Sequence, residues 1–274
     1  MMRSLYSGIT GLRNHQTRMD VIGNNISNVN TAGYKSSRVV FSDIYSQTIS
    51  PASGSTATSG GTNPKQIGLG ASIATIDVMH TASASQYTGA PLDISIEGDG
   101  YFVLSGGGQN TFTRAGNFYT DSNNNLVSSS GAFVQGYTVT NGTTATSLSN
   151  IKIDSKYYDV SIDESGAVVG IDSSNNDEKV TIGYIAIATF NNENALEKVG
   201  QSCYRSTVNS GDAQYSKPGE SGAGTLNPGT LEMSNVDLAG EFTDMIVTQR
   251  GFQANSRIIT TTDSMLEELV NLKR

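Results

Sequence analysis

The fold of this chain is decided by its two ends, which read LYSGITGLRNHQTRMDVIGNNISNV at residues 5–29 and LAGEFTDMIVTQRGFQANSRIITTTDSMLEELVNL at residues 238–272. In both, apolar residues return in steps of three, four or seven, the near-heptad spacing of one helix face. Neither stripe has nearby sequence to cover it, so we expect the ends to pair with each other and with further copies of the chain. The expected assembly contacts are Leu5, Ile9, Leu12, Met19, Ile22, Ile26, Val29, Leu238, Phe242, Met245, Phe252, Ile259, Leu266 and Val270.

The first helix is expected over residues 4–28. It contains Gly8, Gly11 and Gly23, and each glycine costs about 0.5–1 kcal/mol relative to alanine in a helix. A long helix with several glycines is not expected to hold its shape alone.

The second helix is expected over residues 236–272. The run SNVD at 234–237 supplies side chains that can cap its N-terminal end. Lys273 and Arg274 place positive charge at its C-terminal end, where the helix dipole favours it.

The composition changes twice between these helices. Residues 46–65 are nearly all Ser, Thr, Gly, Ala and Pro without periodicity, which indicates a flexible linker. Residues 67–205 alternate short β-rich runs with turn signals, which predicts a mainly antiparallel all-β domain. We therefore expect an α+β protein with coiled-coil-like terminal helices and four parts: an N-terminal helix at 1–33, a linker at 34–66, a β-rich outer domain at 67–230 and a C-terminal helix at 231–274.

Charge and hydropathy exclude several classes of partner. The net charge is −8, made of +4 at residues 1–40 (five Lys/Arg against Asp20), −3 at residues 232–274 (four Lys/Arg against seven Asp/Glu) and −9 between them. An acidic body argues against nucleic-acid binding, which needs a basic face. The sequence contains no run of 18 apolar residues, so it predicts no membrane span. The first residues also lack the apolar segment of a cleaved secretory signal.

Patterns typical of catalysis or metal binding are weak in the sequence. The GDG at 98–100 fits a hairpin turn better than a nucleotide loop, and DSNNN at 121–125 lacks the later Gly and Glu of a calcium loop. His15, His80 and Cys203 have no neighbouring ligands at metal spacing. We therefore expect no enzyme activity, no cofactor and no metal.

Three blocks of the sequence resemble the bacterial flagellar axial proteins, the rod and hook family. They are DVIGNNISNVNTAGYK at 20–35, TRAGNF at 113–118 followed by LV at 126–127, and the C-terminal pair SNVDL at 234–238 and MIVTQRGFQAN at 245–255. The resemblance covers both ends and much of the middle of the chain.

The resemblance implies a structural subunit that polymerises into a helical tube around an export channel, with the terminal helices inside and the β-domain outside. It implies export through the flagellar type III apparatus without a cleaved signal, and a location in the hook or basal body of the flagellum. The implied partners are further copies of the chain, flagellar rod proteins, the hook cap and the hook–filament junction proteins.

Within the family, the sequence favours the hook protein, a flexible joint that transmits torque from rod to filament. The ending LVNLKR at 269–274 resembles hook proteins, and the run at 46–65 followed by QIGLG at 66–70 resembles the compact hook proteins of Gram-positive bacteria. A distal rod subunit has a similar length and also carries an insertion after its first helix, so it is the alternative.

Two other classes remain open at this point. An adhesin or carbohydrate-binding β-protein would suit the Ser/Thr/Asn-rich centre, although it would not need matched terminal helices. A hydrolase would need a polar cluster that the sequence does not reveal. Circular dichroism distinguishes them, because only an assembly subunit should gain helix when it polymerises.

Overall fold

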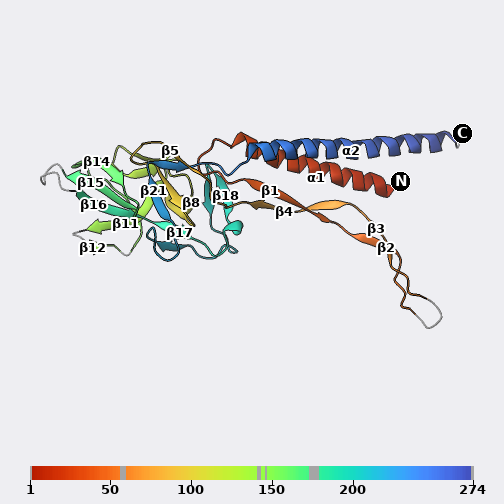
Figure 1. The fold of residues 1–274 in the computed structure, drawn as a ribbon, viewed down its shortest axis with the longest axis horizontal. Helices are drawn as coiled ribbons and strands as arrows, with labels where there is room; N and C mark the ends of the chain where they lie inside the picture. Colours follow the sequence, from red (N-terminus) through yellow and green to blue (C-terminus); the bar gives the residue numbers. More distant parts are fainter. Residues whose placement is uncertain (1, 56–59, 141–142, 146, 173–178, 273–274) are drawn as a thin grey trace. The chain divides into compact units, whose positions relative to one another are not determined.

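The computed structural model describes residues 2–55, 60–140, 143–145, 147–172 and 179–272. Contacts within the chain divide it into two compact units, neither of which is continuous in sequence (Figure 1). The terminal unit comprises the described parts of Met1–Ser27, Ser37–Val78 and Val236–Arg274. The β-body comprises the described parts of Asn28–Ser36 and Met79–Asn235.

The terminal unit contains two antiparallel helices that lie side by side, α1 (Met2–Ser27) and α2 (Leu238–Asn271) (Figure 1). The predicted helices are therefore confirmed to within two residues at each end. Asp237 caps α2, since its side chain accepts a hydrogen bond from the amide of Ala239 at 3.1 Å. The basic residues expected beyond α2, Lys273 and Arg274, lie outside the described residues.

The same unit contains a long two-stranded ribbon, which we call the β-ribbon. Strand β1 (Ser37–Asp43) pairs antiparallel with β4 (Ala71–Val78), and β2 (Ser46–Ser50) pairs antiparallel with β3 (Lys65–Gly68). Backbone hydrogen bonds from Ile44 to Gly70 and from Leu69 to Tyr45 join the two pairs.

The expectation of an irregular linker over residues 46–65 was wrong for the part that forms β2, β3 and the Ser53–Thr62 bridge. All four residues of β3 and the three central residues of β2 are exposed, so this pair of strands has no buried face that would impose alternation of polar and apolar residues. Residues 56–59 of the expected linker lie outside the described residues. The β-rich part also starts later than expected, because β4 belongs to the terminal unit.

The β-body is built around one large sheet. Its main path runs β14-β15-β16-β11-β7-β8-β19-β18, and every described pairing in it is antiparallel. The strands on this path are β7 (Tyr101–Gly106), β8 (Gln109–Thr113), β11 (Phe133–Thr140), β14 (Tyr157–Ile162), β15 (Ala167–Asp172), β16 (Lys179–Ile185), β18 (Glu197–Gly200) and β19 (Cys203–Arg205).

Shorter strands complete the β-body. Joined to the large sheet are β9 (Phe118–Thr120), β10 (Leu126–Ser128), β12 (Thr143–Thr144), β13 (Ser149–Asn150), β17 (Ile187–Thr189) and β20 (Gln214–Ser216). Two small pairs join β5 (Ser85–Tyr87) to β22 (Thr230–Glu232) and β6 (Ile94–Glu97) to β21 (Thr225–Pro228). One 3₁₀ turn, η1, spans Glu193–Ala195.

The hydrophobic core lies in the β-body. It is made mainly of Ile, Val, Leu and Phe side chains that are almost fully buried, among them Ile94, Phe102, Leu104, Leu126 and Val134. The predicted α+β fold with a mainly antiparallel β-domain is therefore confirmed.

Candidate assembly surface

The two helices approach each other closely at glycines. A Cβ atom on Gly11 would lie 2.7 Å from Nδ2 of Asn255, and one on Gly251 would lie 2.6 Å from Cε1 of His15. Gly8 would place its Cβ 3.4 Å from Cγ1 of Ile259. Two of the three glycines that weaken α1 as an isolated helix are therefore sites where the partner helix comes near.

Polar side chains hold the register of the helix pair. Arg18 of α1 forms an ion pair with Asp244 of α2 at 2.9 Å. Asn25 is 2% exposed; its Nδ2 donates to Oε1 of Glu241 at 2.8 Å and to the carbonyl of Ser37 at 2.9 Å. Its Oδ1 accepts from the amide of Ser37 at 3.0 Å. Asn25 therefore ties α1 to both α2 and β1.

These polar contacts were not expected, because the two stripes were defined by apolar residues. Thr248 and Thr262 are buried in α2 and bond back to the carbonyls of Asp244 and Ile258. Both lie at heptad spacing from the apolar residue Met245, so the spacing itself was a usable signal.

The structure brings together part of the predicted contact set. Ile22 is buried, and eight other predicted contacts are half-buried: Leu5, Leu12, Met19, Ile26, Val29, Met245, Ile259 and Leu266. Val29 follows the end of α1 and belongs to the β-body. The remaining five, Ile9, Leu238, Phe242, Phe252 and Val270, are exposed in the single chain.

Helix α2 carries further exposed apolar side chains around this seam. They belong to Ile246, Val247, Ile258, Met265 and Leu269, and they add to the four exposed α2 residues that were predicted as contacts. A helix that is apolar on several sides is normally buried. In the single chain these side chains are only partly covered, so α2 has an apolar surface available for other chains.

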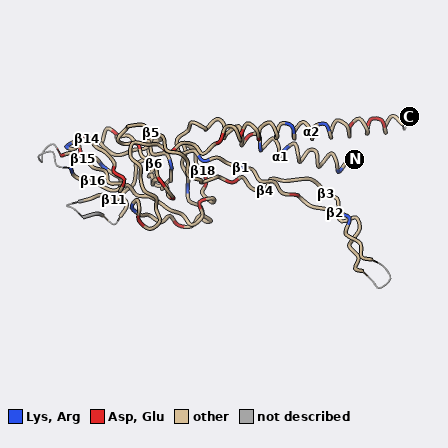
Figure 2. Tube along the Cα trace, viewed as in Figure 1, with Lys and Arg blue, Asp and Glu red and all other residues tan. Residues whose placement is uncertain are grey.

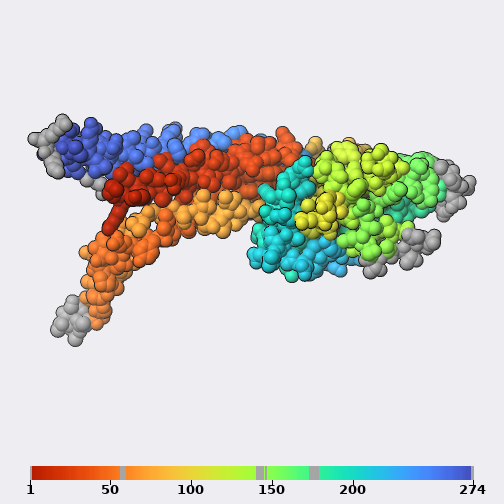
Figure 3. Space-filling model, turned by 180° about the vertical axis from the view of Figure 1, so that it is seen from behind, coloured from red at the N-terminus to blue at the C-terminus, as the bar shows by residue number. Residues whose placement is uncertain are grey.

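The β-ribbon, drawn in orange in Figure 3, also exposes apolar side chains. Its large apolar side chains Ile44, Tyr45, Ile49, Ile67 and Ile76 are all exposed. Lys65 is the only charged residue between positions 46 and 68 (Figure 2). A two-stranded ribbon by itself is marginally stable in water, which favours its burial in an assembly.

A buried ionic cluster lies within the β-body. Nζ of Lys35 is 2.6 Å from Oε1 of Glu232, and one terminal nitrogen of Arg114 is 3.5 Å from Oε2 of the same carboxylate. All three side chains are almost fully buried. Lys35 belongs to the block at 20–35 and Arg114 to TRAGNF, while Glu232 lies two residues before SNVDL. Two of the resemblance blocks therefore meet here.

A tyrosine and a histidine lie next to this cluster. The hydroxyl of Tyr101 donates to Oε2 of Glu193 at 3.1 Å and lies 2.7 Å from Nδ1 of His80. The Tyr101 hydroxyl has one proton and donates it to Glu193, so Nδ1 of His80 must carry a proton and donate it to the Tyr101 oxygen. Burial, with Lys35, Arg114 and Lys198 nearby, lowers the pKa of His80 to about 4. Burial raises the pKa of Glu193 and of Tyr101.

We expect the β-body to lose stability as the pH falls from about 6.5 toward 4. Unfolded His80 has a pKa near 6.5 and folded His80 one of about 4, so the unfolded chain takes up a proton first in this window. The loss is about 1–3 kcal/mol after allowance for solvent access. Glu193 opposes it, because a raised carboxyl pKa favours the folded state at lower pH.

Urea unfolding between pH 4.5 and 7.5 measures this effect. The variant His80→Asn keeps a donor for Tyr101 but does not titrate, so its pH slope should be smaller than that of the parent. His15→Asn, in the terminal unit, is the matched control and should keep the parental slope for the β-body. An unchanged slope in His80→Asn would contradict the assignment.

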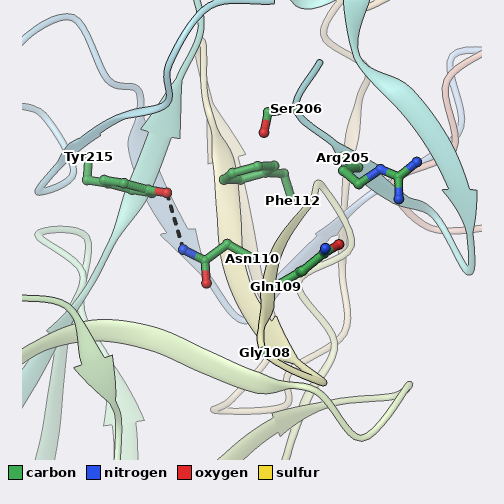
Figure 4. A pocket seen from close by; sticks show the side chains of 7 residues that line it. All are labelled: Gly108, Gln109, Asn110, Phe112, Arg205, Ser206 and Tyr215. Carbon is green, nitrogen blue, oxygen red and sulfur yellow. Dashed lines mark hydrogen bonds between the residues drawn. The ribbon is translucent and has the colours of Figure 1, made fainter. Parts of the chain in front are cut away.

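A shallow cavity of about 440 Å³ opens on the β-body (Figure 4). The cavity is lined by Gly108, Gln109, Asn110, Phe112, Arg205, Ser206 and Tyr215. Two of these residues are hydrogen-bonded to each other, since Nδ2 of Asn110 donates to the hydroxyl of Tyr215 at 3.3 Å. Arg205 is engaged by Glu197 at 2.7 Å.

The described residues contain no group of three or more His, Cys, Asp or Glu side chains that could hold a metal. Cys203 is buried, and burial raises the pKa of its thiol. Among the helices that the structure describes, none is long and apolar enough to cross a membrane.

Comparisons with known proteins match the whole length of the chain. Three family models match: the flagella basal body rod protein at residues 5–35, the flagellar hook protein FlgE/F/G D1 domain at 95–170, and the flagellar basal body rod FlgEFG protein C-terminal at 227–272. The flagellar basal-body rod protein FlgG of Bacillus subtilis is 52% identical over 275 positions, covering all of both chains.

More distant relatives include both rod and hook proteins. FlgG of Borreliella burgdorferi is 39% identical over 280 positions, again covering all of both chains. The flagellar hook protein FlgE of the same organism is 32% identical, with all of both chains covered in an alignment of 443 positions.

Proposed function

We propose that this chain, which belongs to the family of flagellar basal-body rod and hook proteins, is a subunit of the distal rod. Identity is 52% to a rod protein of matching length and 32% to a hook protein whose alignment needs 443 positions. These relatives favour the rod alternative over the hook function that the sequence motifs suggested. The role is structural, as it is in the rest of the family.

The observation that carries the proposal is the apolar surface of α2. Complete burial of a Leu, Val or Phe side chain contributes about 1.5–3 kcal/mol. The nine exposed apolar side chains of α2 are each between 37% and 68% exposed, so each can contribute about 1 kcal/mol when another subunit covers it. Summed over neighbours in a tube, this is enough to drive assembly of a chain whose helix pair is weak alone.

The proposal extends to partners and place. The subunits form a tube with α1 and α2 toward its channel, contact other rod proteins and the hook, and reach their position through the flagellar type III export apparatus. The predicted contact residues act as contacts between subunits, including those that are exposed in the single chain. Location in the flagellum follows from the family, and export without a cleaved signal is part of the proposal.

Complementation tests the choice between rod and hook. The gene is expressed in Bacillus subtilis lacking its FlgG and in Borreliella burgdorferi lacking its FlgE, and basal bodies are examined by electron microscopy. We expect rods to be restored in the first strain and no hooks in the second. Restored hooks with no restored rods would reverse the assignment.

Deletion of residues 51–62 tests the role of the β-ribbon. The deletion spares β2 and β3, while its positions 56–59 lie outside the described residues. We predict that residues 46–65 touch adjacent subunits, so the deletion should leave export intact but produce bent, fragile or absent rods. Secretion assays and electron microscopy measure the two effects.

A length-matched control separates contact from spacing. Replacing residues 51–62 by a Gly/Ser segment of equal length keeps the reach of the chain but removes Pro51 and the paired Ser53 and Thr62. Rods of parental shape from the Gly/Ser replacement would show that the segment is only a spacer, and rods of parental shape from the deletion would contradict the predicted contacts.

A further inference from the structure

The buried cluster around Glu232 joins the two segments that connect the β-body to the rest of the chain. Lys35 lies on the incoming segment, residues 28–36, and Glu232 lies on the outgoing segment, residues 230–235. The segments also share backbone contacts: the amide of Gly33 donates to the carbonyl of Glu232 at 2.8 Å, and the amide of Ser36 donates to Oδ1 of Asn235 at 2.7 Å.

The body contributes the remaining contacts of the same carboxylate. The amide of Ser83 donates to Oε1 of Glu232 at 3.2 Å, and Arg114 reaches Oε2. Lys35 donates in addition to the carbonyl of Thr81 at 2.8 Å. One carboxylate therefore receives contacts from the incoming segment and from two separate parts of the body, while its own backbone belongs to the outgoing segment.

The direct contacts of the cluster are unequal. Two buried cations, Lys35 and Arg114, contact the carboxylate of Glu232, and the more distant carboxylate of Glu193 acts on both through its charge. Removing either cation leaves Glu232 with one cation in contact, whereas removing the carboxylate of Glu232 takes the contacting anion away from both buried cations at once. Buried ion pairs contribute little net stability compared with apolar packing, but breaking one is costly and they favour a single geometry.

We propose that Glu232 is a positioning residue that clamps the incoming and outgoing segments to the β-body, so that force on either segment is passed to the body as a whole. The part of this proposal that concerns force rests on the proposed function, since a rod subunit transmits torque. The clamp itself is a property of the single chain.

Hydrogen–deuterium exchange of the soluble subunit tests the clamp. In Glu232→Gln, the amides of Gly33, Ser36 and Ser83 should exchange about 100-fold faster, because the segments open locally. Amides of the β7–β8 pair should keep their parental rates. Lys35→Met and Arg114→Met should each produce a smaller acceleration, because Glu232 keeps one cation.

Two further variants sharpen the test. Glu232→Asp keeps the anion but is too short to hold all of its contacts, so it should fold and exchange at intermediate rates even if Glu232→Gln fails to fold. Glu197→Gln removes the carboxylate of an ion pair with Arg205 that is exposed and 2.7 Å long. Since exposed pairs contribute little, this control should leave all three amides at parental rates.

Specific results would overturn the clamp. If Lys35→Met accelerates exchange as much as Glu232→Gln, the shared anion has no special role. If Glu232→Gln accelerates exchange uniformly over the β-body, or if Glu232→Asp behaves like the parent, the cluster does not position the segments.

Shear resistance of assembled tubes tests the transmission of force separately. Tubes of Glu232→Asp should break under milder shear than parental tubes, whereas tubes of Glu197→Gln should not. Equal resistance would overturn the mechanical role while the exchange result still decides the clamp. Failure of the parental chain to form tubes would count against the proposed function, and the exchange data of the monomer would be unaffected.

Discussion

Phe252→Asp should abolish polymerisation while leaving the β-body folded. Phe252 is 37% exposed and is one of the nine apolar side chains of α2 that are only partly covered in the single chain. An aspartate there would be buried without a partner in the assembled tube, which is strongly disfavoured. A penalty of about 3 kcal/mol per subunit raises the concentration needed for assembly more than 100-fold.

Thermal unfolding and sedimentation measure the two halves of this result. The β-body should melt as in the parent, because residue 252 belongs to the terminal unit, and the protein should stay in the supernatant. Gln253→Asp introduces the same charge at the next position, which is already polar and exposed, and should polymerise nearly as the parent does. Leu12→Asp should behave like Phe252→Asp. Normal tubes from both apolar-to-Asp variants would show that the terminal helices are not the contact between subunits.

The helices and several of the body strands could be predicted because their signals are local. A stripe of apolar residues at heptad spacing predicts α1 and α2 without any knowledge of which helix packs against the stripe. The N-cap Asp237 was visible beside the start of its helix. Strand β11 (Phe133–Thr140) lies within residues 67–205, where β-rich runs were expected, since six of its eight residues are β-branched or aromatic.

The β-ribbon and the polar contacts could not be predicted because their signals are not local. Strands β2 and β3 expose nearly all of their side chains, so Ser and Thr can occupy them without any pattern. Lys35 and Glu232 lie 197 residues apart, and nothing near either residue in the sequence indicates a buried partner. Asn25 and Thr248 are polar and were not counted in stripes defined by apolar residues, although Thr248 lies at heptad spacing from Met245.

Gly116→Ala should prevent the β-body from folding. Gly116 belongs to the TRAGNF block and is buried, and its carbonyl accepts a hydrogen bond of 3.1 Å from the amide of Ile94. An added Cβ would point onto the carbonyl oxygen of Ile94 and lie 3.1 Å from Cε2 of Phe102. Because the obstacle is backbone, no side-chain rotation can relieve it, and the cost should exceed about 4 kcal/mol.

A matched glycine shows that the effect belongs to the site. Gly106, in strand β7, would place its Cβ 3.4 Å from that of Ala132, which is ordinary contact. Gly106→Ala should change stability by less than about 0.5 kcal/mol, as measured by urea unfolding. A folded Gly116→Ala with parental stability would contradict the packing of β6 against this turn. This expected loss of folding explains why the TRAGNF block contains a glycine. The turn between β8 and β9 lies directly against the backbone of β6, and only a residue without a side chain fits there.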